Sequence, residues 1–203
     1  MALSFSIDLR AAEQDQLLAI ARRSIHRGMS DDRPLAVPLE ELPEALTPAL
    51  GAFVTLTMEG ALRGCIGSLE PAAALAQAVA DAAYSAAFRD PRFPQLQRHE
   101  LDRTTIEISV LSGMATIHAL NSAELLAQLD PGSDGLLIEE GRHRATFLPA
   151  VWETLPSPEE FLAQLMKKAG LPVDHWSATL RCYRYRSVSM KEAEDACNPS
   201  GGS

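Results

Sequence analysis

Apolar residues recur at helical spacing in the longer segments of this chain. Leu17, Ala21 and Ile25 lie four residues apart, which predicts a helix that is capped by Asp8 and stopped by Gly28. The next such segment is rich in alanine and apolar on nearly all sides, which is typical of a helix buried against a sheet. The predicted helices span residues 9–28, 71–88, 121–129 and 157–169, the second of them opening at Pro71.

Shorter segments alternate apolar and polar residues, the period of a β-strand. Residues 51–58 and 61–68 flank Glu59-Gly60 and predict a hairpin, and 104–112 predicts a third strand. A second hairpin, turning at Glu140-Gly141, and a final strand are predicted over residues 134–149 and 178–190. Because strands and helices are mixed without regular βαβ alternation, we expect an α+β fold with a mostly antiparallel sheet flanked by helices.

Composition narrows the class of protein. The chain has 203 residues and a net charge of −9, so nucleic-acid binding would need a local basic patch. Its three cysteines form no CxxC pair, which argues against a disulfide framework or a zinc site. The first residues lack the pattern of a signal peptide, and no apolar run reaches the roughly 18 residues of a membrane span. We expect a cytoplasmic protein whose folded domain covers residues 1–190, with a disordered tail at 191–203.

The sequence LRGCIG, at residues 62–67, places a thiol, a cation and two glycines together on the second strand. By strand alternation Arg63 and Cys65 share a face, with Cβ atoms roughly 6–7 Å apart, where the guanidinium would favour a reactive thiolate. Gly64 and Gly67 would let a ligand or another backbone approach. The alternative interpretation is a buried structural cysteine, with the glycines marking a bulge.

Charged residues further along the chain are candidates for the same site. Arg89 and Arg92 flank Asp90, and with Arg63 they would form an anion-binding corner if the buried helix runs back toward the hairpin. The alternative is that Asp90 pairs with an arginine at the surface, where such a contact contributes little. Glu107, on the third strand, would be a general base or the partner of Arg63, or else a solvated glutamate.

Other familiar signatures are missing or weak. The five histidines show no HxH or HExxH spacing, so no metal site is predicted. The patterns GxGxxG, Walker A and GxSxG are absent, and the sequence leaves the cofactor unknown. Residues 183–186, YRYR, place arginines beside tyrosines; such a segment can stack bases, but on an acidic chain it is more often a strand with one wet face.

Several motifs together resemble a known family. LRGCIG is followed by FRDPRFPQL, IEISVLS, GLLIEEGRHRATFLPAVWE and FLAQLMKKAGL, in the order found in the AMMECR domain family. Bacterial and archaeal members are called AmmeMemoRadiSam system protein A, and the resemblance runs from about Leu9 to about Val188. It implies an α+β fold with a main lobe and a smaller lobe, and LRGCIG near a cleft between them. It also implies a Memo-like protein and a radical SAM protein as partners, but no reaction.

Three classes of function follow from these observations. The first is an accessory or ligand-binding component of a multi-protein system, which needs no complete catalytic set. The second is an enzyme in which Cys65 is the reactive thiol, Arg63 binds an anionic substrate and Glu107 acts as acid or base. The third, a nucleic-acid-binding or adapter protein, is favoured only by the YRYR segment. We expect the first, and the placement of Cys65, Arg63 and Glu107 discriminates between the first two.

Overall fold

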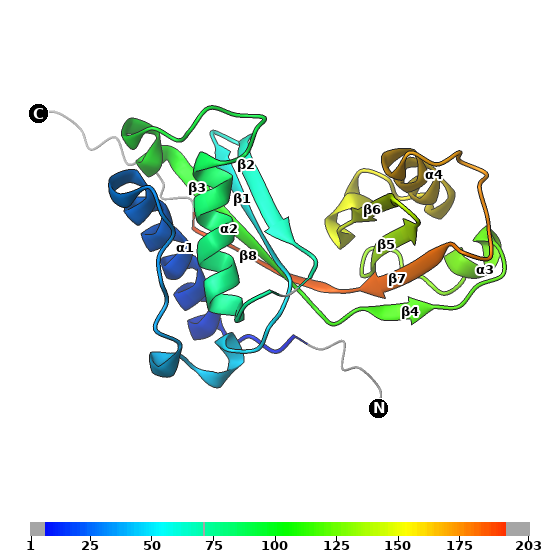
Figure 1. Cartoon of the computed structure of the whole chain (residues 1–203), viewed down its shortest axis with the longest axis horizontal. Helices are drawn as coiled ribbons and strands as arrows, with labels where there is room; N and C mark the ends of the chain where they lie inside the picture. Colours follow the sequence, from blue (N-terminus) through cyan, green and yellow to red (C-terminus); the bar gives the residue numbers. More distant parts are fainter. Residues whose placement is uncertain (1–6, 71, 194–203) are drawn as a thin grey trace, which may run out of the picture. The chain divides into compact units, whose positions relative to one another are not determined.

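The computed structural model describes residues 7–70 and 72–193. These residues form two compact units, each taken by itself below (Figure 1). The N-terminal unit contains residues 8–110 and 189–193, and the C-terminal unit contains residues 111–188 together with Ile7. Pro71, expected to open a helix, and most of the expected tail, residues 194–203, lie outside the described residues.

A four-stranded antiparallel sheet forms the centre of the N-terminal unit. Its strands lie in the order β2-β1-β3-β8, which leaves β2 at one edge. The hairpin predicted between the first two strands is confirmed, because Glu59 and Gly60 both adopt the positive φ angles of a type I′ turn, 53° and 79°. The four strands are β1 (Ala52–Met58), β2 (Ala61–Ser68), β3 (Thr104–Leu111) and β8 (Ser187–Lys191).

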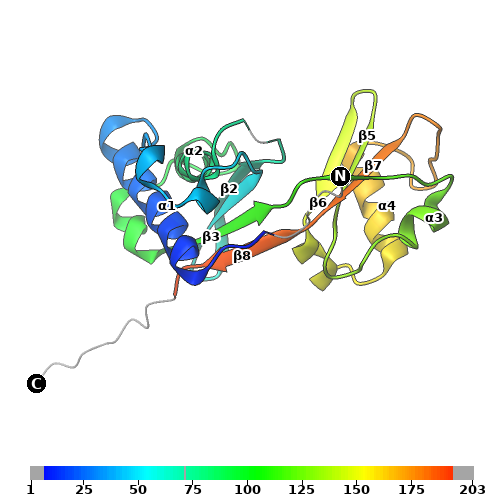
Figure 2. The same ribbon diagram turned by 90° about the horizontal axis from the view of Figure 1, so that it is seen from below.

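Helices α1 (Ala11–Asp31) and α2 (Leu75–Phe88) lie on one face of this sheet (Figures 1 and 2). Strand alternation sends Val54 and Ile106 to the helical side, where both are fully buried. The intervening Thr55 and Glu107 are only half-buried. The sheet therefore has an apolar face covered by helices and a polar open face, as is common for antiparallel sheets.

Both helices of this unit differ at their ends from the prediction. The N-cap of α1 is Arg10 rather than Asp8, and a capping box joins Arg10 and Glu13. The helix also continues through Gly28, which was expected to stop it. A Cβ atom on Gly28 would lie 2.4 Å from Cε2 of Phe88, so this glycine allows α1 and α2 to pack closely. The second helix begins at Leu75, four residues later than predicted.

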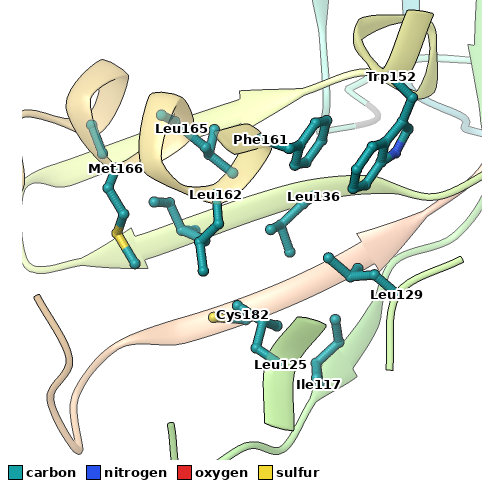
Figure 3. Close-up of a cluster of buried hydrophobic side chains, with 13 residues drawn as sticks. Ile117, Leu125, Leu129, Leu136, Trp152, Phe161, Leu162, Leu165, Met166 and Cys182 are labelled. Carbon is teal, nitrogen blue, oxygen red and sulfur yellow. The ribbon is translucent and has the colours of Figure 1, made fainter. Parts of the chain in front are cut away.

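The C-terminal unit contains a second four-stranded antiparallel sheet, in the order β4-β7-β5-β6. A cluster of buried apolar side chains joins this sheet to its helices, with Trp152 stacked on Phe161 at 3.8 Å between ring centroids (Figure 3). Asn121 and Ser157 cap the two predicted helices of this unit, and the second of these helices ends at Gly170. The elements are β4 (Ala115–Ile117), β5 (Gly135–Glu140), β6 (His143–Phe147), β7 (Arg181–Tyr185), α3 (Ser122–Leu126) and α4 (Pro158–Ala169).

The segment predicted as one final strand is in fact two. Strand β7 ends at Tyr185 and β8 begins at Ser187, and the two strands belong to different sheets. At the break, Ser112 and Arg186 exchange hydrogen bonds: Ser112 N–H donates to the Arg186 carbonyl at 2.8 Å, and Arg186 N–H donates to Ser112 Oγ at 2.9 Å.

Smaller features of the chain complete the fold. The short strand β4 was not predicted, and the second hairpin turns at Gly141-Arg142 because Glu140 pairs with His143. Short 3-10 helices lie at Leu39–Glu41, Glu44–Leu46, Arg98–Arg103 and Pro149–Glu153. Within the described ranges, no helix has the length and apolar character that crossing a membrane requires. The predicted α+β class, with largely antiparallel sheets, is confirmed.

Candidate functional site

Edge strand β2 carries the LRGCIG motif, and its two faces differ. The register with β1 pairs Gly64 with Leu56 and Leu62 with Thr57, so Arg63 is an extra, bulged residue. A bulge interrupts the alternation that would have placed Arg63 and Cys65 on one face. Beyond it alternation resumes, and Gly64 contacts helix α2 while Cys65 belongs to the open face.

Cys65 lies in a row of side chains that crosses three strands. Thr55 is its partner on β1, and Thr55 Oγ1 donates a hydrogen bond to the Cys65 sulfur over 3.3 Å. On the other side, Thr55 pairs with Glu107 of β3. All three residues are half-buried. The open face therefore presents a thiol, a hydroxyl and a carboxylate in one row. The main chains of β2 and β3, at the two ends of this row, are about 10 Å apart.

The expected role of Arg63 beside the thiol is wrong. Its side chain is buried, and its guanidinium makes two hydrogen bonds to Glu100, Nε to Oε1 at 3.0 Å and Nη2 to Oε2 at 2.8 Å. It also donates to the carbonyls of Pro94, at 2.9 Å, and Gln95. The hydrogen bond from Arg63 lowers the pKa of Glu100 to about 2. The partner of Arg63 is thus Glu100 rather than Glu107, and the pair ties the strand to residues 94–100.

Arg92 is instead the cation beside Cys65. Asp90 accepts the Cys65 N–H at 2.9 Å, and Arg92 Nη2 donates to the Cys65 carbonyl at 3.1 Å. Arg92 also makes a fork to Asp90, Nε to Oδ1 at 2.9 Å and Nη2 to Oδ2 at 2.7 Å. Its pKa is raised, first by the hydrogen bond to Asp90 and to a smaller extent by the neighbouring Cys65 sulfur. We call Asp90 and Arg92 the edge clip, because they satisfy the main-chain groups that β2 exposes at Cys65.

The carboxylate of Asp90 is the buried half of the edge clip. Its side chain is only 1% exposed, whereas that of Arg92 is 54% exposed. Hydrogen bonds, first from the Arg92 side chain and then from the N–H groups of Cys65 and Arg92, hold the pKa of Asp90 below its usual range despite burial. Asp90 therefore stays ionised. It pairs with Arg92, as the alternative interpretation expected, but from a buried position in which it also holds the main chain of the motif.

Arg89 does not join the other two arginines. Its guanidinium lies over the ring of Tyr84, 5.0 Å from the centroid, and Nη2 is 3.4 Å from the tyrosine hydroxyl. Arg63, Arg89 and Arg92 therefore end at Glu100, Tyr84 and Asp90, three separate places. The expected anion-binding corner of three arginines is not formed, and Arg92 is the member of the set that lies at the thiol.

The two glycines of the motif make room for the chain itself. A Cβ atom on Gly64 would lie 2.2 Å from the carbonyl oxygen of Ala86 in α2. One on Gly67 would lie 2.3 Å from the Ala52 oxygen and 2.5 Å from the Phe53 ring. The glycines were expected to admit either a ligand or another backbone. At Gly64 the space is taken by the backbone of α2, and at Gly67 it is taken by the neighbouring strand β1.

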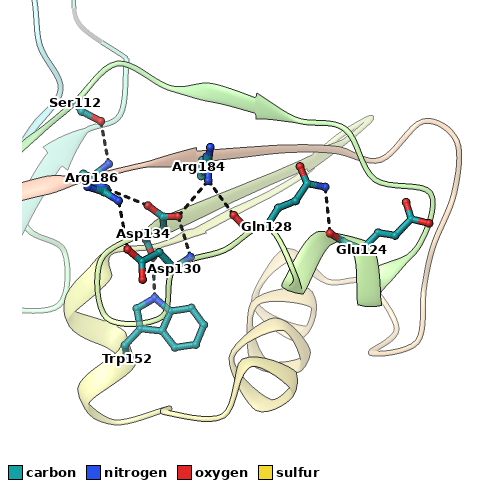
Figure 4. A network of polar contacts seen from close by, with 8 residues as sticks. All are labelled: Ser112, Glu124, Gln128, Asp130, Asp134, Trp152, Arg184 and Arg186. Carbon is teal, nitrogen blue, oxygen red and sulfur yellow. Dashed lines mark hydrogen bonds and ion pairs between the residues drawn. The ribbon is translucent and has the colours of Figure 1, made fainter. Parts of the chain in front are cut away.

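The arginines of the YRYR segment are used within the C-terminal unit (Figure 4). Arg186 Nε is 3.4 Å from Asp134 Oδ1, and Arg184 Nη1 is 3.8 Å from Oδ2 of the same residue. The buried Asp134 also presents its carbonyl to Trp152 Nε1 at 2.7 Å. Tyr185 is fully buried, and burial raises its pKa to about 12. This segment thus carries its cations in ion pairs and one of its tyrosines in the core, rather than a stacking surface for bases.

Two further titratable groups lie in the C-terminal unit. Cys182 is buried in the C-terminal core, and burial raises the pKa of its thiol to about 11. Glu140 accepts hydrogen bonds from Ser177, Thr179 and His175, which lower its pKa to about 2. Since Ser177 donates to the carboxylate and not to the imidazole, this cluster lacks the order of a nucleophilic triad. Across residues 7–70 and 72–193, no group of three or more His, Cys, Asp or Glu side chains could hold a metal ion.

Sequence reasoning missed the residues that hold Cys65 in place. Thr55 gave no signal beyond its position on β1, because a regular hairpin register counted from Glu59-Gly60 places it opposite Gly64, and the bulge at Arg63 shifts its partner to Cys65. Asp90 was noted only as a possible surface partner of an arginine. Glu100 was not considered, and nothing in its surroundings in the sequence marks it, because its partner lies 37 residues earlier.

Comparison with known proteins places the chain among archaeal relatives. The model of the AMMECR1 family matches residues 18–190. A protein from Methanothermobacter thermautotrophicus is 38% identical over 182 residues, covering 87% of this chain and 92% of its own length. Protein MJ0810 from Methanocaldococcus jannaschii is 39% identical over 166 residues, covering 78% and 81%. The crystal structure of uncharacterized protein PH0010 from Pyrococcus horikoshii superposes with a TM-score of 0.83 at 32% identity, covering 91% and 94%.

Proposed function

This chain belongs to the AMMECR1 family, and we propose that it is a cytoplasmic ligand-binding component of a multi-protein system, with its site on the open face around Cys65. The observation that carries the proposal is the row of Cys65, Thr55 and Glu107, whose first member has its main chain fixed by the edge clip. Fixed polar groups on a rigid sheet favour binding, because little conformational freedom is lost when the ligand arrives.

The ligand that this surface suits carries an anionic group. Arg92 is more than half exposed, and its hydrogen bonds to the Asp90 carboxylate and the Cys65 carbonyl use Nε and Nη2. A planar guanidinium with free N–H donors favours carboxylate or phosphate oxygens. Binding of an anion at Arg92 would place the rest of a small ligand over Cys65 and Thr55.

An enzyme that uses Cys65 as its nucleophile is the alternative. The half-exposed thiol beside a guanidinium favours it. A nucleophile also needs a base within about 2.6–3.2 Å. The hydrogen-bond partner of the Cys65 sulfur is the hydroxyl of Thr55, and Glu107 lies one strand further away. We therefore prefer binding to catalysis, and the ion pairs of Arg184 and Arg186 argue against the nucleic-acid alternative.

By resemblance to the AMMECR domain family, we further propose a Memo-like protein and a radical SAM protein as partners. This proposal rests on the family resemblance, and it is tested separately from the site. The tagged chain, expressed in its own host, should retain both partners through purification. Recovery of the chain without either of them, under conditions that keep other complexes intact, would contradict it.

The site is tested by the rates at which two reagents alkylate the native protein. Iodoacetate is an anion and iodoacetamide is neutral, so the ratio of their rates at Cys65 reports a nearby cation. We expect both to label Cys65, and neither to label Cys182, whose pKa burial raises to about 11. Arg92→Gln should lower the iodoacetate-to-iodoacetamide rate ratio about fivefold. This factor corresponds to about 1 kcal/mol, the attraction between two unit charges about 4 Å apart at the dielectric constant of water.

Arg103→Gln provides the matched control, because Arg103 is also about half exposed and paired with a glutamate, Glu59, in the same unit. This change should leave the ratio unaltered. A Cys65 that stays unlabelled until the protein unfolds would refute the site on the open face. Labelling with a ratio that is equal in the wild type and in Arg92→Gln would refute the anionic ligand.

A further inference from the structure

A cavity of about 220 Å³ lies at the C-terminal end of β2, on the side of the strand that faces α2. It is distinct from the open face, because Ile66, which lines it, alternates with Cys65 along the strand. The wall contributed by the helix consists of small or short side chains. The lining includes Ile66 and Ser68 of β2, Ala78, Asp81, Ala82 and Ser85 of α2, and a second acidic residue, Glu70.

The size of this cavity sets the size of its occupant. Ala78, Ala82 and Ser85 follow one another at helical spacing, and all three have short side chains. Since a water molecule takes up about 30 Å³ of liquid, the space corresponds to roughly seven or eight non-hydrogen atoms. That is smaller than a typical drug-sized pocket and suits a compact molecule with an apolar body.

Asp81 gives the cavity a preference for a positively charged ligand. Among the described residues its carboxylate has one hydrogen-bond partner, Gln77 Nε2 at 2.8 Å, which is a neutral amide. Gln77 is itself held, because its Oε1 accepts the Val37 N–H at 2.9 Å and its Nε2 donates to the Leu35 carbonyl at 3.0 Å. The Asp81 carboxylate is therefore held at an apolar wall. No cation among the described residues lies within ion-pair range of it, so a cationic ligand would supply the missing partner.

We infer that this cavity binds a small organic ammonium compound, with its apolar body between Ile66 and Ala82 and its N–H groups on Asp81. The hydroxyl of Ser85 supplies a second acceptor at the same wall. This binding site is independent of the proposed function at Cys65, because it uses the opposite face of β2.

Benzylamine, which has eight non-hydrogen atoms, is a suitable probe, with benzyl alcohol and benzoate as neutral and anionic analogues. Titration of the full chain, followed by NMR chemical shifts of the amides along β2 and α2, should show benzylamine binding at least about tenfold more tightly than either analogue. Asp81→Asn should remove that difference. Asp102→Asn removes an exposed acid elsewhere in the same unit and should leave it unchanged.

Filling the cavity provides a second test. Ala78→Leu places a larger side chain at the half-buried end of the helical wall and should abolish binding of benzylamine. If that variant fails to fold, Ser85→Leu fills the same wall from another half-buried position. Equal affinity for benzylamine and benzyl alcohol would overturn the inference. So would a preference for the amine that persists in Asp81→Asn, or binding that survives in a folded cavity-filled variant.

Discussion

Replacing Glu100 with glutamine removes the negative charge that faces Arg63 and leaves the side-chain shape almost unchanged. In the native protein the side chain of Arg63 is 9% exposed and that of Glu100 is 14% exposed. Without the charge, the guanidinium stays buried, and its acceptors are all neutral: the amide oxygen of the new side chain and the carbonyls of Pro94 and Gln95. An unpaired buried cation is costly, because water no longer solvates it and no anion compensates for that loss.

The expected destabilisation follows from this burial. Breaking a buried ion pair costs about 3–5 kcal/mol, and we take about 3 kcal/mol because the glutamate retains some access to water. For a chain of this size, about 2–4 °C of melting temperature corresponds to each kcal/mol, so Glu100→Gln should melt roughly 6–12 °C lower. Glu59→Gln removes the exposed pair with Arg103 and should cost less than about 1 kcal/mol.

Thermal unfolding followed by circular dichroism gives the melting temperature of both variants. The pH dependence of these melting temperatures is a second test. The pKa of Glu100 falls from its ordinary 4.5 to about 2 in the folded protein. Its contribution to stability is therefore complete above pH 4.5 and is lost as the pH falls from 4.5 toward 2. The difference in melting temperature between the wild type and Glu100→Gln should shrink over that interval.

Two results would refute this reasoning. Equal shifts for Glu100→Gln and Glu59→Gln would mean that burial of the Arg63 pair has no energetic consequence. A difference between the wild type and Glu100→Gln that stays constant from pH 6 to pH 3 would mean that the carboxylate charge is not the cause.

Three further changes test how the motif and the helix ends are held. Gly64→Ala should lower the free energy of unfolding by at least about 2 kcal/mol in chemical denaturation, because its Cβ would lie 2.2 Å from a carbonyl oxygen. Gly113→Ala, whose Cβ meets nothing within 4 Å, should change it by less than about 0.5 kcal/mol, and equal losses would contradict the packing argument. Asp90→Ala should speed amide hydrogen exchange at Cys65 about tenfold or more, since the N–H loses its acceptor; an unchanged rate would count against the edge clip. Gly170→Ala should cost about 1 kcal/mol in the same denaturation assay because its φ is 76°, and a neutral result would argue against the left-handed cap.

The candidate site could be located from the sequence, but its contacts could not. The Glu59-Gly60 turn predicted that Cys65 lies on a hairpin, and strand alternation predicted that its side chain points to one face of the sheet. The same alternation assigned Arg63 to that face, and the bulge at Arg63 removed the basis for the assignment. A bulge depends on how two strands pair along their whole length, so a single strand read by itself does not reveal it.

Local rules of the chain thus determined the elements of this protein. Strand period, helical period and the Glu59-Gly60 turn each involve residues a few positions apart, and the predicted hairpins and helices are present, with ends that differ at the first two helices and at the second hairpin turn. Tertiary structure alone decided which side chains meet. Glu100 reaches Arg63 across 37 residues, and Asp90 reaches Cys65 across 25. Such partners are selected by burial, because a charge withdrawn from water must find its counterpart wherever the fold brings one near.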